Sequence, residues 1–176
     1  MSNLTPKPLN VAYVSYLSAF QNIGGGEILL LKMKEYVERA GVRVKLFDMW
    51  NDKLENFDLI HVFGSVKECL DLIRVANVRK TKVAITPLFW SSWKRAFGSY
   101  GSAREKADFF LRHAMKLVCP AFPSGRRSMM LASDLIFPNS VMEQDQLSRL
   151  FAIPRSRMTV VYNGVDRRFA EADPAA

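Results

Sequence analysis

The sequence predicts an α/β fold, with an open parallel sheet of about six or seven strands and helices on both of its faces. Short apolar runs rich in β-branched residues alternate with stretches whose apolar residues recur at helical spacing. The connections between successive apolar runs are too long for hairpins, which favours parallel strands. The chain has 176 residues, 49% of them hydrophobic, which suits a single domain with its own core.

The first strand, helix and second strand follow one another closely. Residues 11–16 have the composition of a buried parallel strand, and a loop with three consecutive glycines follows them. From Glu27 onward the apolar residues fall on one face of a helix, and Gly41 stands where a left-handed cap would end it. Residues 42–47 are then expected to form the second strand.

The later elements repeat this alternation. Three Ser-x-x-Glu sequences, beginning at Ser65, Ser102 and Ser140, have the spacing of a capping box and predict helix starts. Each comes after a predicted strand, and a shorter helix is expected after Ser124. The further strands are expected at residues 58–63, 82–88, 135–137 and 159–162.

Composition excludes several classes of protein. The apolar content and the 11% of aromatic residues exclude a disordered chain. Cys69 and Cys119 have no metal-cluster spacing and fit a reducing compartment. The amino terminus lacks the apolar core of a signal peptide, and no apolar stretch is long enough to span a membrane. We therefore expect a cytoplasmic protein.

The positive charge is concentrated in one region. Residues 89–130 contain eight Lys or Arg residues and two acidic ones, within a formal net charge of +8 for the chain. Such a patch indicates a charged partner. These cations are spread over a loop and two helices without a helix-turn-helix, zinc-finger or RNP pattern, so nucleic acid is not expected to be the partner.

A basic aromatic loop leaves two interpretations open. Residues 89–101 hold five aromatic residues together with Lys94 and Arg95. Aromatic rings and cations suit a membrane interface, so residues 89–130 could make a peripheral contact at the inner face of the membrane, or this loop could grip an acceptor. In the other interpretation, Phe89 and Trp90 end a buried strand while the two cations are solvated.

Ligands of parallel sheets bind beyond the carboxyl ends of the strands, which selects the loops at residues 17–26, 64–65, 89–101 and 139–140. The glycines at 24–26 suit an anion at a helix terminus, or a plain turn followed by the helix carboxylate Glu27. Neither the G-x-G-x-x-G nor the G-x-x-x-x-G-K-[ST] pattern occurs.

The histidines give little sign of catalysis. His61 lies in the middle of a predicted strand, where a hydrogen-bonded core histidine is the favoured interpretation. His113 lies in a basic helix and is expected on the solvated surface. No Ser-His-Asp arrangement, H-E-x-x-H motif or D-x-D carboxylate pair appears, and no bound metal is expected.

The last third of the chain carries a longer pattern. Residues 132–140 are followed by Leu147, Phe151 and an Ile153-Pro154 turn, and residues 157–166 end in Asn-Gly-Val-Asp. This stretch resembles the domain-joining region of family 4 glycosyltransferases with the GT-B fold. The elements Gly24-Gly25-Gly26-Glu27 and, at residues 58–61, Asp-Leu-Ile-His are also similar to family patterns.

The resemblance implies a domain organisation and a reaction. Residues 1–166 would be the amino-terminal, Rossmann-like half of a GT-B fold, residues 167–176 would begin the interdomain linker, and the carboxyl-terminal donor-binding domain would be missing. The intact enzyme would transfer a sugar from a nucleotide-sugar to a saccharide, lipid-linked or small-molecule acceptor, with retention and without a metal or other cofactor. The nucleotide-sugar, a co-substrate, would be held mainly by the missing domain, so the chain alone would be inactive.

The resemblance also implies roles for residues. The loop Gly24, Gly25, Gly26 and Glu27 would face the donor diphosphate, and Asn163 and Gly164 would mark the hinge. The family histidine at the end of the fourth strand is absent, with Leu88 at or next to its position. The cleft candidates are His61, Gly64, Thr86, Trp90, Trp93, Lys94, Arg95 and Ser140.

Two other functions stay open. The chain could be a complete binding module, or one subunit of a two-polypeptide transferase. It could also be an NAD- or S-adenosylmethionine-dependent enzyme, for which Asp48, after the second strand, would hold a ribose. The glycine spacing speaks against that enzyme.

Overall fold

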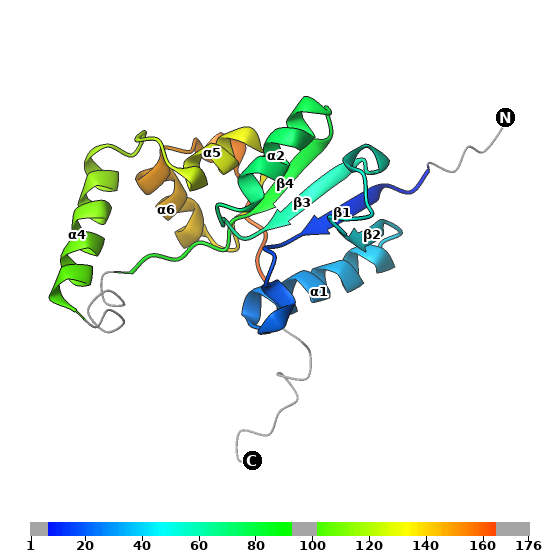
Figure 1. Ribbon diagram of the computed structural model, residues 1–176, viewed down its shortest axis with the longest axis horizontal. Helices are drawn as coiled ribbons and strands as arrows, with labels where there is room; N and C mark the ends of the chain where they lie inside the picture. The colour runs from blue at the N-terminus through cyan, green and yellow to red at the C-terminus, as the bar shows by residue number, and fades with distance from the viewer. Residues whose placement is uncertain (1–6, 93–101, 165–176) are drawn as a thin grey trace, which may run out of the picture.

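The computed structural model describes residues 7–92 and 102–164, which form a parallel five-stranded sheet in the order β2-β1-β3-β4-β5 with helices on both faces (Figure 1). The strands are β1 (Asn10–Val14), β2 (Arg43–Leu46), β3 (Leu59–Phe63), β4 (Lys82–Thr86) and β5 (Leu135–Ile136). The helices are α1 (Gly25–Arg39), α2 (Cys69–Val78), α4 (Ala103–Val118), α5 (Gly125–Ala132) and α6 (Val141–Phe151), with short 3₁₀ turns at Ala19–Gln21, Leu54–Asn56 and Arg155–Arg157. The α/β class with a parallel sheet is confirmed.

The described part of the chain has fewer strands than the six or seven predicted, and the strand expected at residues 159–162 accounts for the difference. Met158 makes a single parallel bridge to Ile136. The amides of Thr159 and Val161 then donate to the carbonyls of Ile136 and Pro138, at 3.0 and 2.9 Å. The return bond of a parallel ladder would come from the amide of residue 138, and proline has none. The pairing therefore stops after one bridge.

The two faces of the sheet are covered by different helices. Alternate residues of each strand point to opposite faces, so Ala12 packs toward α2, α5 and α6 while its neighbour Tyr13 packs toward α1. Ile73 of α2 and Leu147 of α6 are fully buried in the larger core, and Leu30 of α1 is 1% exposed in the smaller one. Gly41 follows α1 with a φ of 88°, the left-handed conformation expected there.

The three predicted capping boxes have different outcomes. The one at Ser102 is formed in full. At Ser140 the hydroxyl accepts from the amide of Glu143 at 3.0 Å, but the Glu143 carboxylate accepts from the amides of Phe89 and Asn139 instead of completing the box. This buried carboxylate thereby joins the segments that follow β4 and β5.

The capping box at Ser65 is absent, so that prediction was wrong. Helix α2 begins at Cys69, four residues later, and Glu68 precedes it without a side-chain cap. The Ser65 hydroxyl instead accepts a hydrogen bond from Arg126 Nε at 3.1 Å. A long-range contact has replaced the local one.

Helix α4 stands apart at one end of the molecule (Figure 1) and packs mainly against α6 rather than the sheet. Within the described residues, no helix combines the length and apolar character that crossing a bilayer requires.

Candidate functional site

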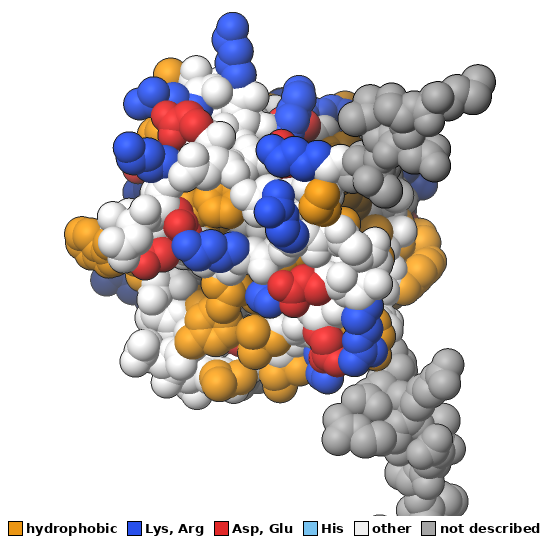
Figure 2. All heavy atoms as spheres, turned by 90° about the vertical axis from the view of Figure 1, so that its right-hand side faces the viewer, with side chains coloured by type: hydrophobic (Ala, Val, Ile, Leu, Met, Phe, Trp, Pro, Cys, Tyr) orange, Lys and Arg blue, Asp and Glu red, His pale blue; other side chains and the backbone are white. Residues whose placement is uncertain are grey.

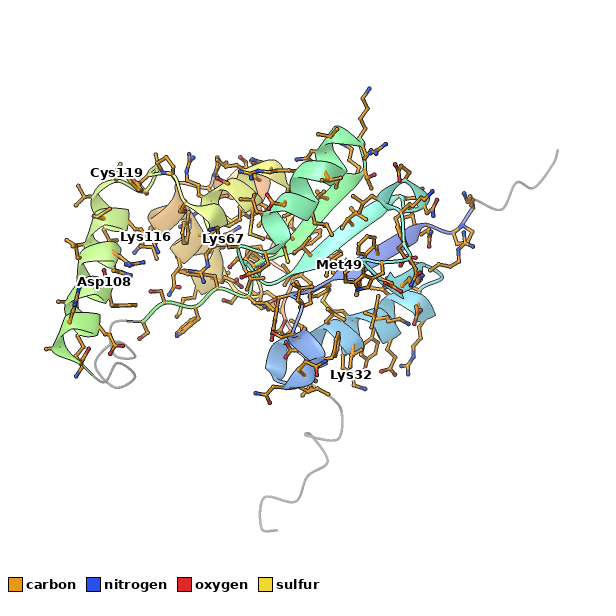
Figure 3. All side chains as sticks on the ribbon, viewed as in Figure 1. Lys32, Met49, Lys67, Asp108, Lys116 and Cys119 are labelled. Atoms are coloured by element: carbon orange, nitrogen blue, oxygen red, sulfur yellow. The ribbon has the colours of Figure 1, made fainter. Side chains whose placement is uncertain are left out.

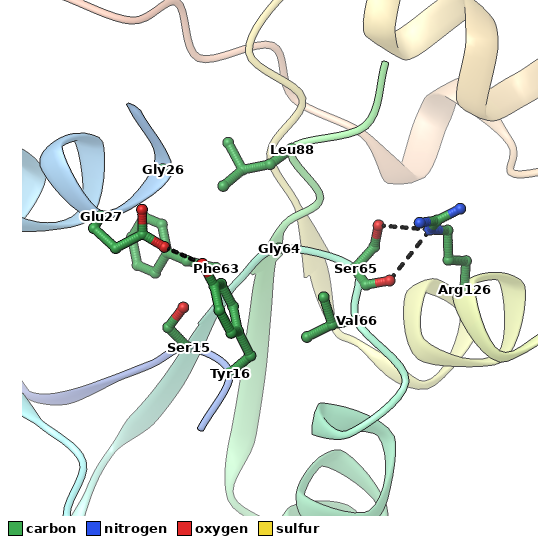
Figure 4. A pocket seen from close by; sticks show the side chains of 10 residues that line it. All are labelled: Ser15, Tyr16, Gly26, Glu27, Phe63, Gly64, Ser65, Val66, Leu88 and Arg126. Atoms are coloured by element: carbon green, nitrogen blue, oxygen red, sulfur yellow. Dashed lines mark hydrogen bonds between the residues drawn. The ribbon is translucent and has the colours of Figure 1, made fainter. Parts of the chain in front are cut away.

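A pocket lies between β1 and β3, where the order in which successive strands join the sheet reverses. The chain leaves β1 toward β2 on one side, and it leaves β3 toward β4 on the other, so the loops after these neighbouring strands diverge. Such a switch point opens a crevice at the carboxyl ends of the strands. The pocket holds about 260 Å³ and is lined by residues that follow β1, β3 and β4 and by the first turns of α1 and α5 (Figure 4).

One wall of this pocket is the carboxylate of Glu27, which is only 5% exposed. Its Oε1 accepts a hydrogen bond from the Tyr16 hydroxyl at 2.5 Å, and its Oε2 accepts one from the Gly24 amide at 2.8 Å. The bond from Tyr16, and after it the bond from Gly24, lowers the pKa of Glu27. The wall therefore presents a fixed, ionised hydrogen-bond acceptor.

The glycine loop makes room for this carboxylate and donates a hydrogen bond to it. A Cβ on Gly24 would lie 3.2 Å from Glu27 Oε2, so glycine lets the carboxylate reach the Gly24 amide without crowding. In the described part of the chain, no hydrogen bond leaves the amides of Gly25 and Gly26, which belong to the first turn of α1. The amide of Gly24 is thus taken by the chain's own carboxylate, whereas Gly26 lines the pocket and its amide is available to a ligand there.

The other wall is the guanidinium of Arg126 in α5. Its Nε donates to the Ser65 carbonyl at 3.2 Å and to the Ser65 hydroxyl at 3.1 Å, and its Cζ lies 5.3 Å from the centre of the Phe89 ring. Burial lowers the pKa of Arg126, but a guanidinium keeps its charge in proteins. Figure 4 shows Glu27 and Arg126 on opposite sides of the pocket.

Two residues between these walls have left-handed backbone conformations. Gly64 has a φ of 91° and donates its amide to the Thr86 carbonyl at 2.8 Å. Leu88 has a φ of 51°, which costs a residue with a Cβ roughly 1 to 2 kcal/mol. A Cβ on Gly26 would lie 3.4 Å from Leu88 Cδ1, so the leucine side chain reaches across to the glycine loop. Strained backbone conformations cluster at functional sites, so the conformation of Leu88 supports a functional role for this pocket.

This arrangement suits a ligand that carries both an anionic group and hydroxyls. The guanidinium of Arg126 and the amide of Gly26 would bind the anion, and the Glu27 carboxylate would accept hydrogen bonds from hydroxyls. The volume is below that of a pocket for a drug-sized molecule, typically at least about 300 Å³. The pocket therefore fits a group of the size of a phosphate or a single sugar ring.

His61 and Thr86 lie beneath this pocket, within the sheet. Both are buried, and His61 Nε2 lies 2.9 Å from Thr86 Oγ1. The imidazole stacks on Phe63 and meets the edges of Tyr13 and Phe137. Burial lowers the pKa of His61 to about 4, so the ring is neutral at pH 7. This is the environment of a hydrogen-bonded core histidine.

The remaining predicted site residues are spread over the molecule. Gly26, Glu27 and Gly64 line the pocket. Ser140 caps α6, Trp90 is half exposed, and Asn163 and Gly164 are exposed. Trp93, Lys94 and Arg95 lie outside the described residues.

Seven residues that line the pocket were not among the predicted site residues, although Ser65 belongs to a loop that the strand-end rule selected. They are Ser15, Tyr16, Phe63, Ser65, Val66, Leu88 and Arg126. Ser15 and Tyr16 directly follow β1, so the rule that selects strand ends could have found them. Arg126 meets Ser65 across 61 positions of sequence, and no local pattern announces that contact.

The surroundings of Asp48 do not support a ribose site. Its carboxylate accepts from the amide of Trp50 and from both the amide and the side chain of Asn51, so it holds a turn after β2. No cluster of three or more His, Cys, Asp or Glu residues that could hold a metal is found in residues 7–92 and 102–164.

The chain matches no model of a known protein family, and a comparison with curated proteins finds no match either.

Proposed function

We propose that this chain is the amino-terminal, acceptor-side half of a GT-B, family 4-like glycosyltransferase. The whole enzyme would transfer a sugar from a nucleotide-sugar to an acceptor hydroxyl, with retention and without a bound metal. The pattern in residues 132–166 supports the family. The observation that carries the chemistry is the pocket at the β1–β3 switch point, with a carboxylate and a guanidinium on opposite walls.

The polar groups of the pocket would have two roles toward the donor. Arg126 and the amide of Gly26 would stabilise negative charge on the diphosphate as the bond to the sugar breaks. Glu27, held by Tyr16 and Gly24, would accept hydrogen bonds from sugar hydroxyls and orient the ring. Leu88, at or next to the position where many family members have a histidine, offers no side-chain hydrogen bond, so orientation of the sugar would depend more on Glu27.

The size of the pocket supports a shared binding site. A space of about 260 Å³ takes a phosphate or a sugar ring, not a whole nucleotide-sugar. The nucleoside would therefore be held by a second domain. For the same reason, this chain alone would bind a nucleotide-sugar weakly or not at all.

The test uses this chain and the longer polypeptide, if its reading frame continues. Calorimetry with a panel of nucleotide-sugars should show weak or no binding to the 176-residue chain and clear binding to the longer polypeptide. In the longer polypeptide, Arg126→Gln should lower kcat/KM by about 10- to 100-fold, the value of one charge-assisted hydrogen bond.

Arg74→Gln is the matched control, because Arg74 is an exposed arginine of α2 that forms an ion pair with Asp71 within the same helix. It should leave kcat/KM unchanged. Tight, stoichiometric binding of a nucleotide-sugar to the 176-residue chain would contradict the proposal, and so would an Arg126→Gln enzyme with full activity.

A further inference from the structure

Helix α4 turns its apolar side away from the protein. At 100° per residue, its alanines share one side of the helix with Leu111, Leu117 and Val118. These three large side chains are 63%, 49% and 86% exposed. Of the described helices, α4 separates its apolar from its polar residues most strongly.

The side of α4 that faces the protein is polar and aromatic. His113 is buried there, and its Nδ1 lies 3.3 Å from the Ser91 hydroxyl. Lys116 extends toward α6 (Figure 3), where its Nζ lies 5.1 Å from the centre of the Phe151 ring. The helix is therefore attached through the side that would ordinarily face water.

The polar residues around the apolar stripe carry a positive surplus. The four cations of α4 are Arg104, Lys106, Arg112 and Lys116. Of its two acidic residues, Asp108 is paired with Arg112 at 2.8 Å, and Glu105 accepts from the amide and the hydroxyl of Ser102. Both carboxylates are thus engaged at the helix itself.

At the opposite end of the molecule the charged side chains are distributed differently. Figure 2, which faces that end, shows acidic and basic side chains interspersed. Ion pairs of this kind include Lys34 with Glu38 and Lys45 with Asp52. The combination of an outward apolar stripe and a local excess of cations therefore distinguishes the α4 end.

We propose that the outward side of α4 binds the surface of a lipid bilayer that contains anionic lipids. The helix would lie in the plane of the interface, with Leu111, Leu117 and Val118 among the upper acyl chains and with Arg104 and Lys106 at the headgroups. A second copy of the chain fits this surface less well, because two α4 helices would bring like charges together. The proposal rests on α4 alone and holds whether or not the chain is half of a transferase.

Contacts also connect this surface to the pocket. Ser91, which touches His113, exchanges two hydrogen bonds of 2.9 Å with the side-chain amide of Gln146 in α6. Leu88, three residues before Ser91, lines the pocket. A membrane-bound α4 would therefore hold the pocket in a defined position relative to the bilayer.

The experiment is co-sedimentation with vesicles, using matched pairs of substitutions. The double variant Leu117→Gln, Val118→Gln removes two large apolar groups from α4. The control Val75→Gln, Val78→Gln removes two residues of α2 that are 49% and 80% exposed, close to the 49% and 86% of the first pair. Circular dichroism and thermal unfolding check that both variants fold.

Unsubstituted protein should sediment with vesicles of phosphatidylcholine and phosphatidylglycerol, and less with phosphatidylcholine alone. The α4 variant should bind at least about tenfold more weakly, the loss expected for roughly two buried CH₂ groups, and the α2 variant should bind like the unsubstituted protein. Absence of binding to the mixed vesicles would overturn the proposal, as would equal losses in the two variants. A self-association that the α4 variant abolishes, without vesicle binding, would assign the surface to a second copy instead.

Discussion

Helices α1 and α4 are nearly equal in length, with 15 and 16 residues, but they use their apolar sides in opposite ways. Helix α1 buries Leu30 against the sheet and carries ion pairs on its outer side, among them Lys34 with Glu38. Helix α4 keeps His113 against the protein and exposes Leu117 and Val118. Both helices are amphipathic, but different parts of the molecule surround them.

The difference arises from the position of each helix in the chain. Helix α1 connects the adjacent parallel strands β1 and β2, and such a crossover packs its helix back on the sheet. Helix α4 belongs to the long connection between β4 and β5, where α5 and α6 already supply buried residues to that face. Amphipathic periodicity therefore reveals an apolar side but does not tell what covers it.

The largest expected effect comes from truncating one leucine in each helix. Leu30→Ala should lower the free energy of unfolding by roughly 2 to 5 kcal/mol, because Leu30 is 1% exposed and its loss leaves a cavity. Leu117→Ala should change it by no more than about 0.5 kcal/mol, since that side chain is already half exposed. Urea unfolding, followed by circular dichroism, measures both values. A similar loss of unfolding free energy in the two variants would show that the two helices do not differ in how they bury their apolar sides.

The two histidines provide the second test, because His61 lies in the sheet and His113 in α4. Burial lowers the pKa of both, to about 4 for His61. In the unfolded chain a histidine has a pKa of about 6.5, so His61 takes up a proton at a higher pH in the unfolded chain than in the folded protein. Stability supplied by a neutral His61 is present above about pH 6.5 and is lost as the pH falls toward 4, by about 3 kcal/mol in total.

Unfolding curves measured across this pH range should separate the two sites. His61→Phe should remove most of the pH dependence, whereas His113→Gln should remove a smaller part because His113 is less deeply enclosed. The quantity to compare is the slope of the unfolding free energy with pH. The absolute stability is not suitable, because His61→Phe also leaves Thr86 Oγ1 without its partner and lowers stability at every pH. An unchanged slope in His61→Phe would show that the buried ring does not control it.

The smallest expected effect concerns the start of α4. Ser102→Ala removes the hydroxyl that accepts from the Glu105 amide and should cost about 1 kcal/mol of local helix stability. Because α4 packs mainly against α6 and not the sheet, its amides should exchange with solvent about fivefold faster while those of α1 stay unchanged. Hydrogen exchange by mass spectrometry reads both helices. Equal acceleration in α1 and α4 would show that they unfold together.

Much of the fold could be predicted because its signals are local. Apolar runs placed the five strands, Ser102 begins a helix where expected, and Gly41 ends one. The errors arose where a distant residue changed a local preference. Arg126 occupies the Ser65 hydroxyl that was expected to cap α2, and Pro138 stops the strand expected at residues 159–162.

The location of the pocket could be predicted from the sequence, but the full set of residues that line it could not. The strand-end rule selected the loops that hold Gly26 and Gly64, which do line it. The guanidinium that forms the opposite wall comes from α5, and sequence spacing alone could not bring it there. His113, expected in solvent, is 9% exposed because the polar side of α4 faces the protein.

The proline that ends the pairing beside β5 also limits the edge of the sheet. A sheet edge with a regular row of unpaired amides and carbonyls is a template for another strand, and natural proteins interrupt such edges. Beside β5 the row is broken after the bridge between Ile136 and Met158, and the chain continues without regular strand structure to Gly164. Pro138 thus keeps this edge short, and we expect Pro138→Val to lengthen the pairing of β5 with residues 158–161, measured as slower exchange of the amides in that segment.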